Sequence, residues 1–500
     1  MENLNIWVAF LTTALAVFFE AFRRLQSRRK PAATLVGWPV GPRRLPIIGN
    51  LHQLAKGGDL VHRALANLAR VHGRVMTIWL GSWTPMIVVS DSELVWEVLV
   101  GKSSDYASRA LPSISKFINA DFRSVATSDM GPHWHSLRRG LQNGPLGPAN
   151  VAAQAHLQEG DVAALIQTLK KEATQSDDGV VWPFGPIRHT TIRLLARLCF
   201  GADFDDEEFV KAMDRVVEDT ISITGHGRLV DAFAFARFLP SVRRTFQQTL
   251  HVKRKIEEVI RPHLSPSPPQ NSFLDVLLSQ NLPEEVTIFC IFEVFLLGVD
   301  STASTTAWAL AFLIHHQDVQ EKLHREISDY HRKEGGKKIV KAEDVSKLQY
   351  LQAVVKETMR MKPIAPLAVP HKTTKDTKLN GRSVGKGTQV VVNIYSVHYD
   401  PKVWTEPERF SPERFLAGGV KQGKNEKLQD QSFIPFGGGM RTCAGMELGK
   451  LQVALAVANL VGAFRWAPAV ASELPDMSEE MTFVLMMKNP LAARIMVHDE

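Results

Sequence analysis

One stretch near the C-terminus constrains this chain more than any other: Phe436-Gly437-Gly438-Gly439-Met440-Arg441-Thr442-Cys443-Ala444-Gly445. Three consecutive glycines come before a single cysteine, and glycine backbone can take positive φ and approach a flat ligand without a Cβ clash. The sequence from Met446 to Leu455 is typical of a helix. We therefore expect Cys443 just ahead of a helix N-terminus, where the helix dipole favours a thiolate. Arg441 lies two residues before the thiol and could pair with an acidic group of the same ligand.

A single thiolate in a glycine loop can serve only a few chemical functions. Structural zinc needs about four ligands, and no second cysteine or histidine lies near Cys443 in the sequence. The other cysteines, Cys199 and Cys290, sit in apolar helical runs, which gives no disulfide framework and suits a reducing compartment. A cysteine nucleophile would need a histidine base, which another part of the fold could supply. A haem iron needs one axial thiolate, which pushes electron density toward O–O cleavage.

The order Phe-x-x-Gly-x-Arg-x-Cys-x-Gly resembles the signature of the cytochrome P-450 monooxygenases at every fixed position. Phe436, Gly439, Arg441, Cys443 and Gly445 carry the match. The resemblance implies a mainly α fold with small β-sheets behind an N-terminal membrane anchor helix. It also implies haem b as the cofactor, with Cys443 as the axial ligand of the iron and the other four residues around the haem.

Length and charge are consistent with one large domain after an N-terminal segment. No Ser/Gly linker, low-complexity run or internal repeat divides the 500 residues, and 45% of them are hydrophobic, enough for a sizeable core. The net charge is +7, and much of the excess lies early in the chain. We interpret this bias as attraction to a membrane surface and expect no nucleic-acid partner.

The N-terminal segment predicts an uncleaved anchor. Leu4 to Phe19 is uncharged and mostly apolar, slightly shorter than the roughly 17–25 residues of a spanning helix, and Ala21 and Phe22 lengthen it. Basic residues follow directly, so the rest of the chain is expected to stay cytosolic. A cleaved secretory peptide would have its basic residues before the apolar run and a small-residue cleavage site after it, and neither is present.

These features divide the chain into three parts. Residues 1–30 form the membrane anchor and its basic stop, residues 31–50 a proline-rich hinge, and residues 51–500 the haem-thiolate catalytic domain. In the family such a hinge orients the catalytic domain on the endoplasmic reticulum membrane. We therefore expect a single-pass protein of that membrane with a cytosolic catalytic domain.

A long apolar helix is predicted from Thr287 to His316, and its centre contains a carboxylate. Burying a carboxylate is costly unless it has a partner or a function. Leu297-Gly298-Val299-Asp300-Ser301 resembles the family's oxygen-activation motif, which implies that Asp300 and Ser301 deliver protons to bound dioxygen. Most members have threonine where Ser301 stands and Ala or Gly where Leu297 stands. Gly298 is expected to leave room against a flat ligand.

The resemblance also assigns expected roles to two further groups of residues. Trp134 and Arg138 are four residues apart, on one face of a helix, and in the family this pair reaches a haem propionate. His371 looks like another propionate partner. Glu357 and Arg360 match the family's Glu-x-x-Arg pair, which a later arginine completes. Arg409 and Arg414 are both candidates for that arginine, and the family spacing selects Arg414.

The predicted substrate pocket is apolar. Val75 to Ser90 indicates a β-hairpin, Gly385 to Asn393 a turn and a strand, and Met481 to Leu485 a hairpin tip over the substrate. Asp105 to Arg123 has little periodicity and reads as a loop, which in the family covers the substrate. The expected lining residues are Leu297, Leu367, Val369, Phe483 and Leu485, which suit a small aromatic substrate.

The reaction type follows from the cofactor that the resemblance implies. Electrons come from NADPH through a membrane-bound NADPH–cytochrome P-450 reductase. Leu296 to Leu310 resembles plant microsomal members that close methylenedioxy bridges in alkaloids, lignans and phenylpropanoids, and those members also have serine at the position of Ser301. An ortho-methoxyphenol would then be oxidised at its methoxy group and closed by its own phenol oxygen, without a protein nucleophile.

Other activities remain open at this stage. An aromatic hydroxylase or O-demethylase shares every motif named above. An O₂-independent haem-thiolate isomerase or dehydratase is a second alternative, and the retained Asp300 and Ser301 argue against it. A haem-based sensor or carrier would leave this acid–alcohol pair without a purpose.

Overall fold

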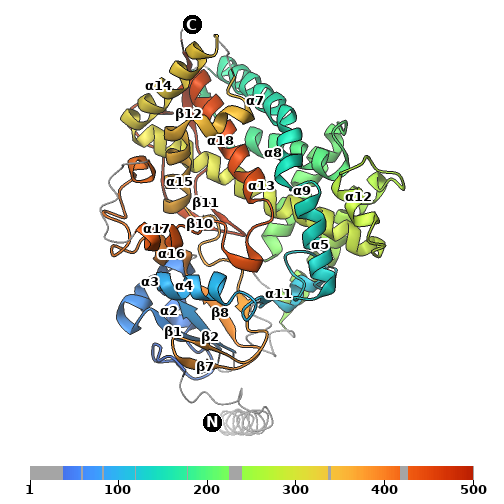
Figure 1. Ribbon diagram of the computed structural model, residues 1–500, viewed down its shortest axis with the longest axis vertical. Helices are drawn as coiled ribbons and strands as arrows, with labels where there is room; N and C mark the ends of the chain where they lie inside the picture. Colours follow the sequence, from blue (N-terminus) through green and yellow to red (C-terminus); the bar gives the residue numbers. More distant parts are fainter. Residues whose placement is uncertain are drawn as a thin grey trace, which may run out of the picture.

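Helices make up most of the computed structural model, and strands form four small sheets in the described part (Figure 1). The structure describes residues 38–498 except 58–59, 82–83, 119, 177, 225–238, 336–338 and 417–425. The predicted membrane anchor over residues 1–30 and the first seven residues of the predicted hinge lie outside the described residues. The mainly α architecture with small sheets is the one that the sequence predicts.

Helix α13 (Glu284–His315) runs through the helical part of the molecule. Figure 1 shows it between α8 (Phe184–Phe200) and α18 (Met446–Ala463), and both of these helices pack against it. The helix is apolar all round, as expected for a helix buried on every side. It confirms the predicted helix and begins three residues earlier, with Glu284 and Glu285 in a first turn that favours carboxylates.

Two described helices, α13 and α18, are long and apolar enough to cross a membrane by length and composition. Their most apolar windows are 78% and 56% buried inside the structure, respectively. Their apolar surfaces therefore build the core around the site.

The largest sheet contains five strands in the order β1-β2-β8-β5-β3. β1 (Val75–Leu80) and β2 (Thr84–Val89) form the predicted antiparallel hairpin, and β2 pairs in parallel with β8 (Gln389–Val392), which confirms the predicted turn and strand. β5 (His371–Lys372) and β3 (Ser108–Arg109) complete the sheet. Figure 1 shows this sheet at the lower end, where blue strands from early in the chain lie beside orange ones.

The remaining elements surround this framework, and residues 151–280 are mainly helical as predicted, outside the undescribed 225–238. The other helices are α2 (Leu51–Leu54), α3 (Val61–His72), α4 (Ser92–Trp96), α5 (Pro132–Asn143), α6 (Pro148–Ala153), α7 (Ala155–Gln175), α9 (Glu207–Thr224), α11 (Pro240–Ile260), α12 (Phe273–Leu278), α14 (Gln317–Lys333), α15 (Gln349–Met361), α16 (Ile394–His398) and α17 (Glu426–Ser432). The other strands are β4 (Val180–Val181), β6 (Thr377–Leu379), β7 (Arg382–Val384), β9 (Phe464–Pro468), β10 (Glu479–Met481), β11 (Leu485–Met487) and β12 (Ala493–Val497). The segment predicted as a loop after Asp105 contains β3 and a short 3₁₀ helix over Ser113–Ile118.

A buried ionic network ties α15 to the segment before the cysteine loop. Glu357 lies 2.7 Å from Nε of Arg360 and 2.9 Å from Nε of Arg414, and all three side chains are almost fully buried. This confirms Arg414 as the third member. Arg409 contributes only its main-chain carbonyl to the network, because its own guanidinium pairs with Glu406 at the surface.

The described part of the predicted hinge packs against β1. The hydroxyl of Thr77 donates to the carbonyl of Pro39 at 2.7 Å, and the amide of Trp79 donates to the side chain of Asn50 at 2.9 Å. A Cβ on Gly41 would lie 1.9 Å from the carbonyl oxygen of Thr77, so only glycine allows this close approach. Residues 38–50 are thus joined to the sheet by specific contacts.

Candidate active site

The cysteine loop has the local geometry that its glycines predict. Gly437 and Gly439 take positive φ values of 70° and 61°. A Cβ on Gly439 would lie 2.0 Å from the carbonyl oxygen of Leu99, so this position excludes every other residue. The amide of Cys443 donates to the carbonyl of Phe436 at 3.0 Å, which closes the loop just before α18 begins.

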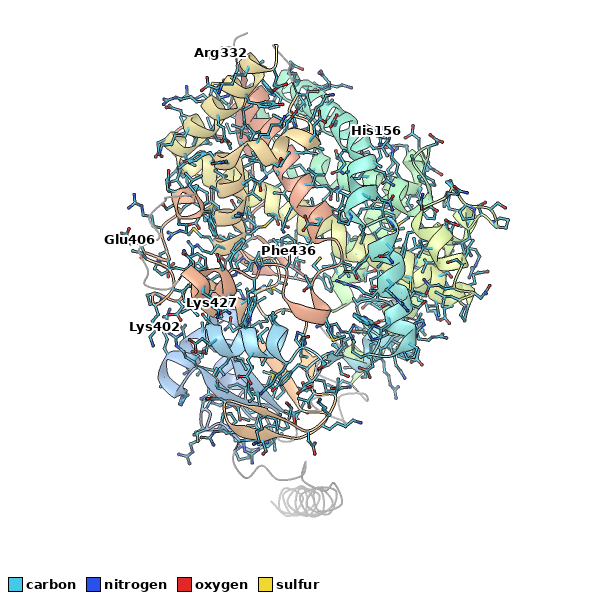
Figure 2. The ribbon with its side chains drawn as sticks, in the orientation of Figure 1. His156, Arg332, Lys402, Glu406, Lys427 and Phe436 are labelled. Atoms are coloured by element: carbon cyan, nitrogen blue, oxygen red, sulfur yellow. The ribbon has the colours of Figure 1, made fainter. Side chains whose placement is uncertain are left out.

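The thiol of Cys443 lies deep in the protein and is still accessible. Its surface is accessible to solvent, yet burial raises the pKa of the thiol, while the Gly445 amide and the charge of Arg138 oppose that rise. A group that is accessible and also surrounded by protein can be reached by a ligand that binds beside it. Figure 2 shows Phe436, from the same loop, near the middle of the molecule.

Three arginines converge on the same loop. Arg138 on α5 donates to the carbonyl of Thr442 at 2.7 Å, and Arg441 donates to the carbonyls of Ala107 and Ser128 at 2.7 and 2.6 Å. The third arginine, Arg109 on β3, was not predicted from the sequence. Its guanidinium donates to the carbonyls of Val369 at 2.9 Å and Ala126 at 3.3 Å.

The charges of these arginines are only partly compensated by the protein, because Glu293 and Asp129 act on Arg109 and Arg441 without forming a salt bridge. Burial, together with the neighbouring guanidinium groups, lowers the pKa of Arg109 to about 9 and that of Arg441 to about 10. Burial also lowers the pKa of Arg138. No carboxylate among the described residues forms a salt bridge with any of the three. Buried cations in this arrangement need an anionic ligand.

Haem b fits this donor set. It would offer iron to the Cys443 thiol, a flat ring to the glycine loop and two propionates to the buried arginines. The residues that would hold it are Cys443 as metal ligand, Phe436, Gly439 and Gly445 of the loop, and the side chains of Arg109, Trp134, Arg138, His371 and Arg441. A Cβ on Gly445 would meet nothing within 4 Å, so this glycine leaves open space beside the thiol.

Trp134 and His371 lie at this cluster as neutral donors. The indole of Trp134 donates to the carbonyl of Val125 at 3.0 Å, and the guanidinium of Arg441 lies 4.8 Å from its ring centre. Burial and the Arg109 charge lower the pKa of His371 to about 3, so its ring is neutral. Nδ1 therefore donates to the carbonyl of Tyr106 at 2.7 Å, and Nε2 lies 3.4 Å from Nη1 of Arg109.

Glu293 on α13 is a second residue that the sequence analysis missed. Its buried carboxylate accepts hydrogen bonds from the Ser124 hydroxyl and the Ala126 amide. Burial raises its pKa to about 7 despite these bonds. The same segment offers the carbonyls of Val125 and Ala126 to the arginines, so Glu293 holds the arginine cluster in place. A carboxylate in an apolar helical run was the signal used for Asp300, and it would have found Glu293 too.

Asp300 is buried and paired with a residue far away in the sequence. Its carboxylate is 1% exposed and lies 2.7 Å from Nη1 of Arg188 on α8. Arg188 also donates through Nε to Asp214 on α9 at 3.0 Å, and Glu218 lies 3.7 Å away. Burial raises the pKa of Asp300, the Arg188 charge opposes this, and Asp214 and Glu218 add to it. The groups connect the surface of α9 with the centre of α13.

Ser301 is partly exposed beside Asp300. Its hydroxyl donates to the carbonyl of Leu297 at 2.7 Å, within the helix. This hydrogen bond uses the proton of the hydroxyl group, so the oxygen can still accept a hydrogen bond from another donor.

Comparison with known proteins decides the family. A family model described as cytochrome P450 matches residues 39–494. The chain belongs to the cytochrome P450 family. A solved zebrafish cytochrome P450 structure superposes with a TM-score of 0.72 at 25% identity, covering 87% of this chain and 99% of that one. The P450 fold and the haem-thiolate iron that the family implies agree with the sequence-based prediction.

Plant enzymes are much more similar in sequence to this P450. It is 58% identical to the piperic acid synthase of Piper nigrum over 470 residues, covering 93% of this chain and 91% of that protein. It is 55% identical to the (S)-canadine synthase of Coptis japonica over 458 residues, covering 92% of each chain. The relatives are methylenedioxy-bridge-forming P450s of plant alkaloid and lignan metabolism, which confirms the subfamily resemblance.

One expectation for α13 of this P450 is corrected by the structure. A Cβ on Gly298 would lie 2.9 Å from Cδ1 of Leu195 on α8. The space beside Gly298 is thus filled by packing between α13 and α8, and it is not room for a flat ligand. Leu297, in contrast, is 38% exposed in a helix whose other residues are mostly buried, so it borders open space.

The other predicted pocket residues differ in their surroundings. Val369 and Phe483 are partly exposed, and Phe483 packs against the core cluster that contains residues of α13. Leu367 is partly buried and packs against the cluster under the large sheet. Leu485 is fully buried, so its side chain packs inside the protein and is not accessible to a substrate. Their contact with a substrate stays a prediction.

The predicted hairpin tip itself is present. β10 and β11 are antiparallel, with Met481 opposite Leu485, which leaves residues 482–484 at the turn. The amide of Leu485 donates to the carbonyl of Ile364 at 2.9 Å. The tip therefore lies beside the segment from Ile364 to His371 that was predicted to line the pocket.

Proposed function

We propose that this protein is a plant haem-thiolate monooxygenase that closes a methylenedioxy bridge on a small ortho-methoxyphenol of alkaloid, lignan or phenylpropanoid type. The observation that carries the proposal is the agreement between site and relatives. An accessible, deeply placed Cys443 thiol lies among arginines that form no salt bridge with a described carboxylate, and more than half of the residues are identical to those of bridge-forming enzymes. The overall change removes two hydrogens from the substrate, while O₂, NADPH and a proton become two waters and NADP⁺.

When bound, the haem supplies dioxygen activation and oxidation of the methoxy carbon. The protein supplies the residues that would hold the haem and stabilise its charges. Cys443 would supply the thiolate that holds the iron, and the Gly445 amide and Arg138 would stabilise its negative charge. Arg109, Arg138 and Arg441 would pair with the propionates, and Trp134 and His371 orient two of these guanidinium groups.

Protons reach the site through α13. Asp300 lies between the surface network of Arg188, Asp214 and Glu218 and the partly exposed Ser301. Neither oxygen of Asp300 accepts a well-aligned hydrogen bond from a described residue, so the carboxyl group can exchange a proton with a water or hydroxyl that approaches it. Ser301 then passes the proton toward the haem side.

The same network argues against an O₂-independent isomerase or dehydratase. Such an enzyme has no dioxygen to protonate and gains nothing from a buried aspartate. Keeping the Asp300 carboxylate buried requires the partnership of Arg188. The O-demethylase and hydroxylase alternatives share the network and are separated from bridge closure by their products.

The substrate is held by apolar surface. Leu297, Val369 and Phe483 offer partly exposed apolar side chains, which suit an aromatic ring. Ring closure needs the methoxy carbon and the neighbouring phenol oxygen to remain in one plane. A flat apolar slot would maintain this arrangement without a protein nucleophile.

The membrane and the electron source complete the proposal. The apolar Leu4 to Phe19 followed by basic residues anchors the protein in the endoplasmic reticulum membrane, with its catalytic domain in the cytosol. Electrons then come from NADPH through a membrane-bound NADPH–cytochrome P450 reductase.

A labelled substrate tests the proposal. Microsomes that contain the protein and a plant reductase are given an ortho-methoxyphenol with a trideuterated methyl group. Bridge closure keeps two of the three deuterium atoms in the product, whereas O-demethylation loses the label and ring hydroxylation keeps all three. Product formation without NADPH would contradict the monooxygenase, and loss of the label in every product would contradict bridge closure.

A further inference from the structure

The hairpin of β10 and β11, which carries Phe483 at its turn, is held against the neighbouring helices by a buried ionic cluster. The side chain of Glu479 in β10 is only 1% exposed, and its carboxylate lies 2.6 Å from Nζ of Lys362 and 2.8 Å from Nη2 of Arg63. Nε2 of His62 lies 3.8 Å from the same carboxylate. The hairpin is thereby connected to the end of α15 and to the start of α3.

Both cations of the cluster are held by additional contacts. Nζ of Lys362 donates to the carbonyl of Met477 at 3.1 Å and lies 4.1 Å from the ring centre of Trp308 on α13. The guanidinium of Arg63 lies 5.4 Å from the ring centre of Tyr395 on α16. Glu479 therefore contacts side chains whose own positions are determined by four helices, α3, α13, α15 and α16.

The second strand of the hairpin is fixed independently. The amide of Leu485 donates to the carbonyl of Ile364, and the indole of Trp308 donates to the carbonyl of Leu485 at 3.4 Å. With both strands held, the tip over residues 482–484 places Phe483 against the core cluster that contains Leu296 and Val299.

A buried ion pair adds little net stability compared with apolar residues of the same size. Its distinctive property here is a fixed geometry, because a carboxylate between two cations cannot shift without losing one of them. Glu479 thus fixes the position of the first strand, while Trp308 and Ile364 hold the second.

We propose that Glu479 is a positioning residue that sets the depth of the hairpin tip and, through Phe483, the orientation of the aromatic substrate. The inference rests on the proposed function only for the identity of the reaction. With the tip in place, the oxidised methoxy carbon is captured by the neighbouring phenol oxygen. With a loose tip, water competes for that carbon, and the resulting hemiacetal releases formaldehyde and leaves a catechol.

Glu479→Gln keeps the size of the side chain and removes its charge. Glu480→Gln is a matched control, because Glu480 is the next residue of β10 and is exposed. Both variants are prepared as full-length, haem-loaded protein. In Glu479→Gln we expect faster amide hydrogen exchange over residues 479–487, a dissociation constant for the ortho-methoxyphenol raised about tenfold, and a product mixture shifted from bridged product to catechol. The carbon monoxide difference band should be unchanged.

Equal exchange, affinity and product ratio in Glu479→Gln and Glu480→Gln would overturn the inference. If Glu479→Gln does not fold, Lys362→Met provides the same test, because it removes one of the two cations and leaves Glu479 paired with Arg63. A wild-type protein that forms no bridged product would contradict the proposed function instead, and hydrogen exchange and substrate affinity would still test the role of Glu479.

Discussion

The carboxylate of Asp300 and the guanidinium of Arg188 lie 2.7 Å apart, although they belong to different helices, α13 and α8. Arg188 contacts Asp214 on α9 with the same guanidinium group. Asp214 is partly exposed, so the pair connects solvent with the centre of the site.

Asp300→Asn should slow product formation by about a hundredfold, because proton transfer by a positioned side chain contributes about 10²–10⁴-fold. We also expect a larger solvent deuterium isotope effect on NADPH-dependent turnover. The exposed Asp318 on α14 offers a control, Asp318→Asn, that should behave like the wild type. A normal rate in Asp300→Asn would show that the Arg188 pair serves the fold alone.

Ser301→Ala should raise the hydrogen peroxide released for each NADPH consumed. The reason is that alanine cannot deliver a proton for cleavage of the O–O bond, so reduced dioxygen is released as hydrogen peroxide before it oxidises the substrate. Ser301→Thr keeps the hydroxyl, and its methyl group restricts the rotamer, so coupling should be retained or improved. Peroxide release that is the same in all three proteins would assign Ser301 to packing within α13.

Cys443→Ala should abolish the absorption band of the carbon monoxide complex that a haem-thiolate centre produces, because the axial ligand is lost. Cys290→Ala is the control, since Cys290 is a fully buried cysteine on α13. It should keep the band with a modest loss of thermal stability. A normal band in Cys443→Ala would assign the ligand to another residue.

Short motifs within one segment were predictable from the sequence, because their geometry is local. The loop before Cys443, the hairpin of β1 and β2 and the pair of Glu357 with Arg360 all belong to this class. The choice of Arg414 over Arg409 also proved correct, because the family spacing is rigid there.

Contacts between segments far apart in the chain were not predictable. Arg188 could not be assigned to Asp300, and Arg109 could not be assigned to the arginine cluster, because one sequence does not show which helices and strands become neighbours. Gly298 was misinterpreted for the same reason. The sequence shows that a side chain is missing there, but only the fold shows that Leu195 fills the space.

Glu479 should make part of the stability depend on pH. Burial raises its pKa, but His62, Lys362 and Arg63 outweigh this and hold the pKa at about 2, below its ordinary value of 4.5. A lowered carboxyl pKa contributes stability that is present above the ordinary value and is lost as the pH falls toward the native value.

The wild type should therefore lose more thermal stability than Glu479→Gln between about pH 5 and about pH 3. The unfolding midpoint of both proteins, measured by circular dichroism at the two pH values, checks this. Parallel losses in the two proteins would mean that the Glu479 carboxylate is not held in its charged form by the cluster.

Bridge closure is tested most directly by the mass of the product formed from an unlabelled ortho-methoxyphenol under ¹⁸O₂, with NADPH and a plant reductase. Both oxygens of a methylenedioxy bridge come from the substrate. We therefore expect a product that is lighter than the substrate by two hydrogens and contains no heavy oxygen. A product that has gained one heavy oxygen, or one that has lost a methylene unit, would contradict bridge closure and identify a hydroxylase or an O-demethylase.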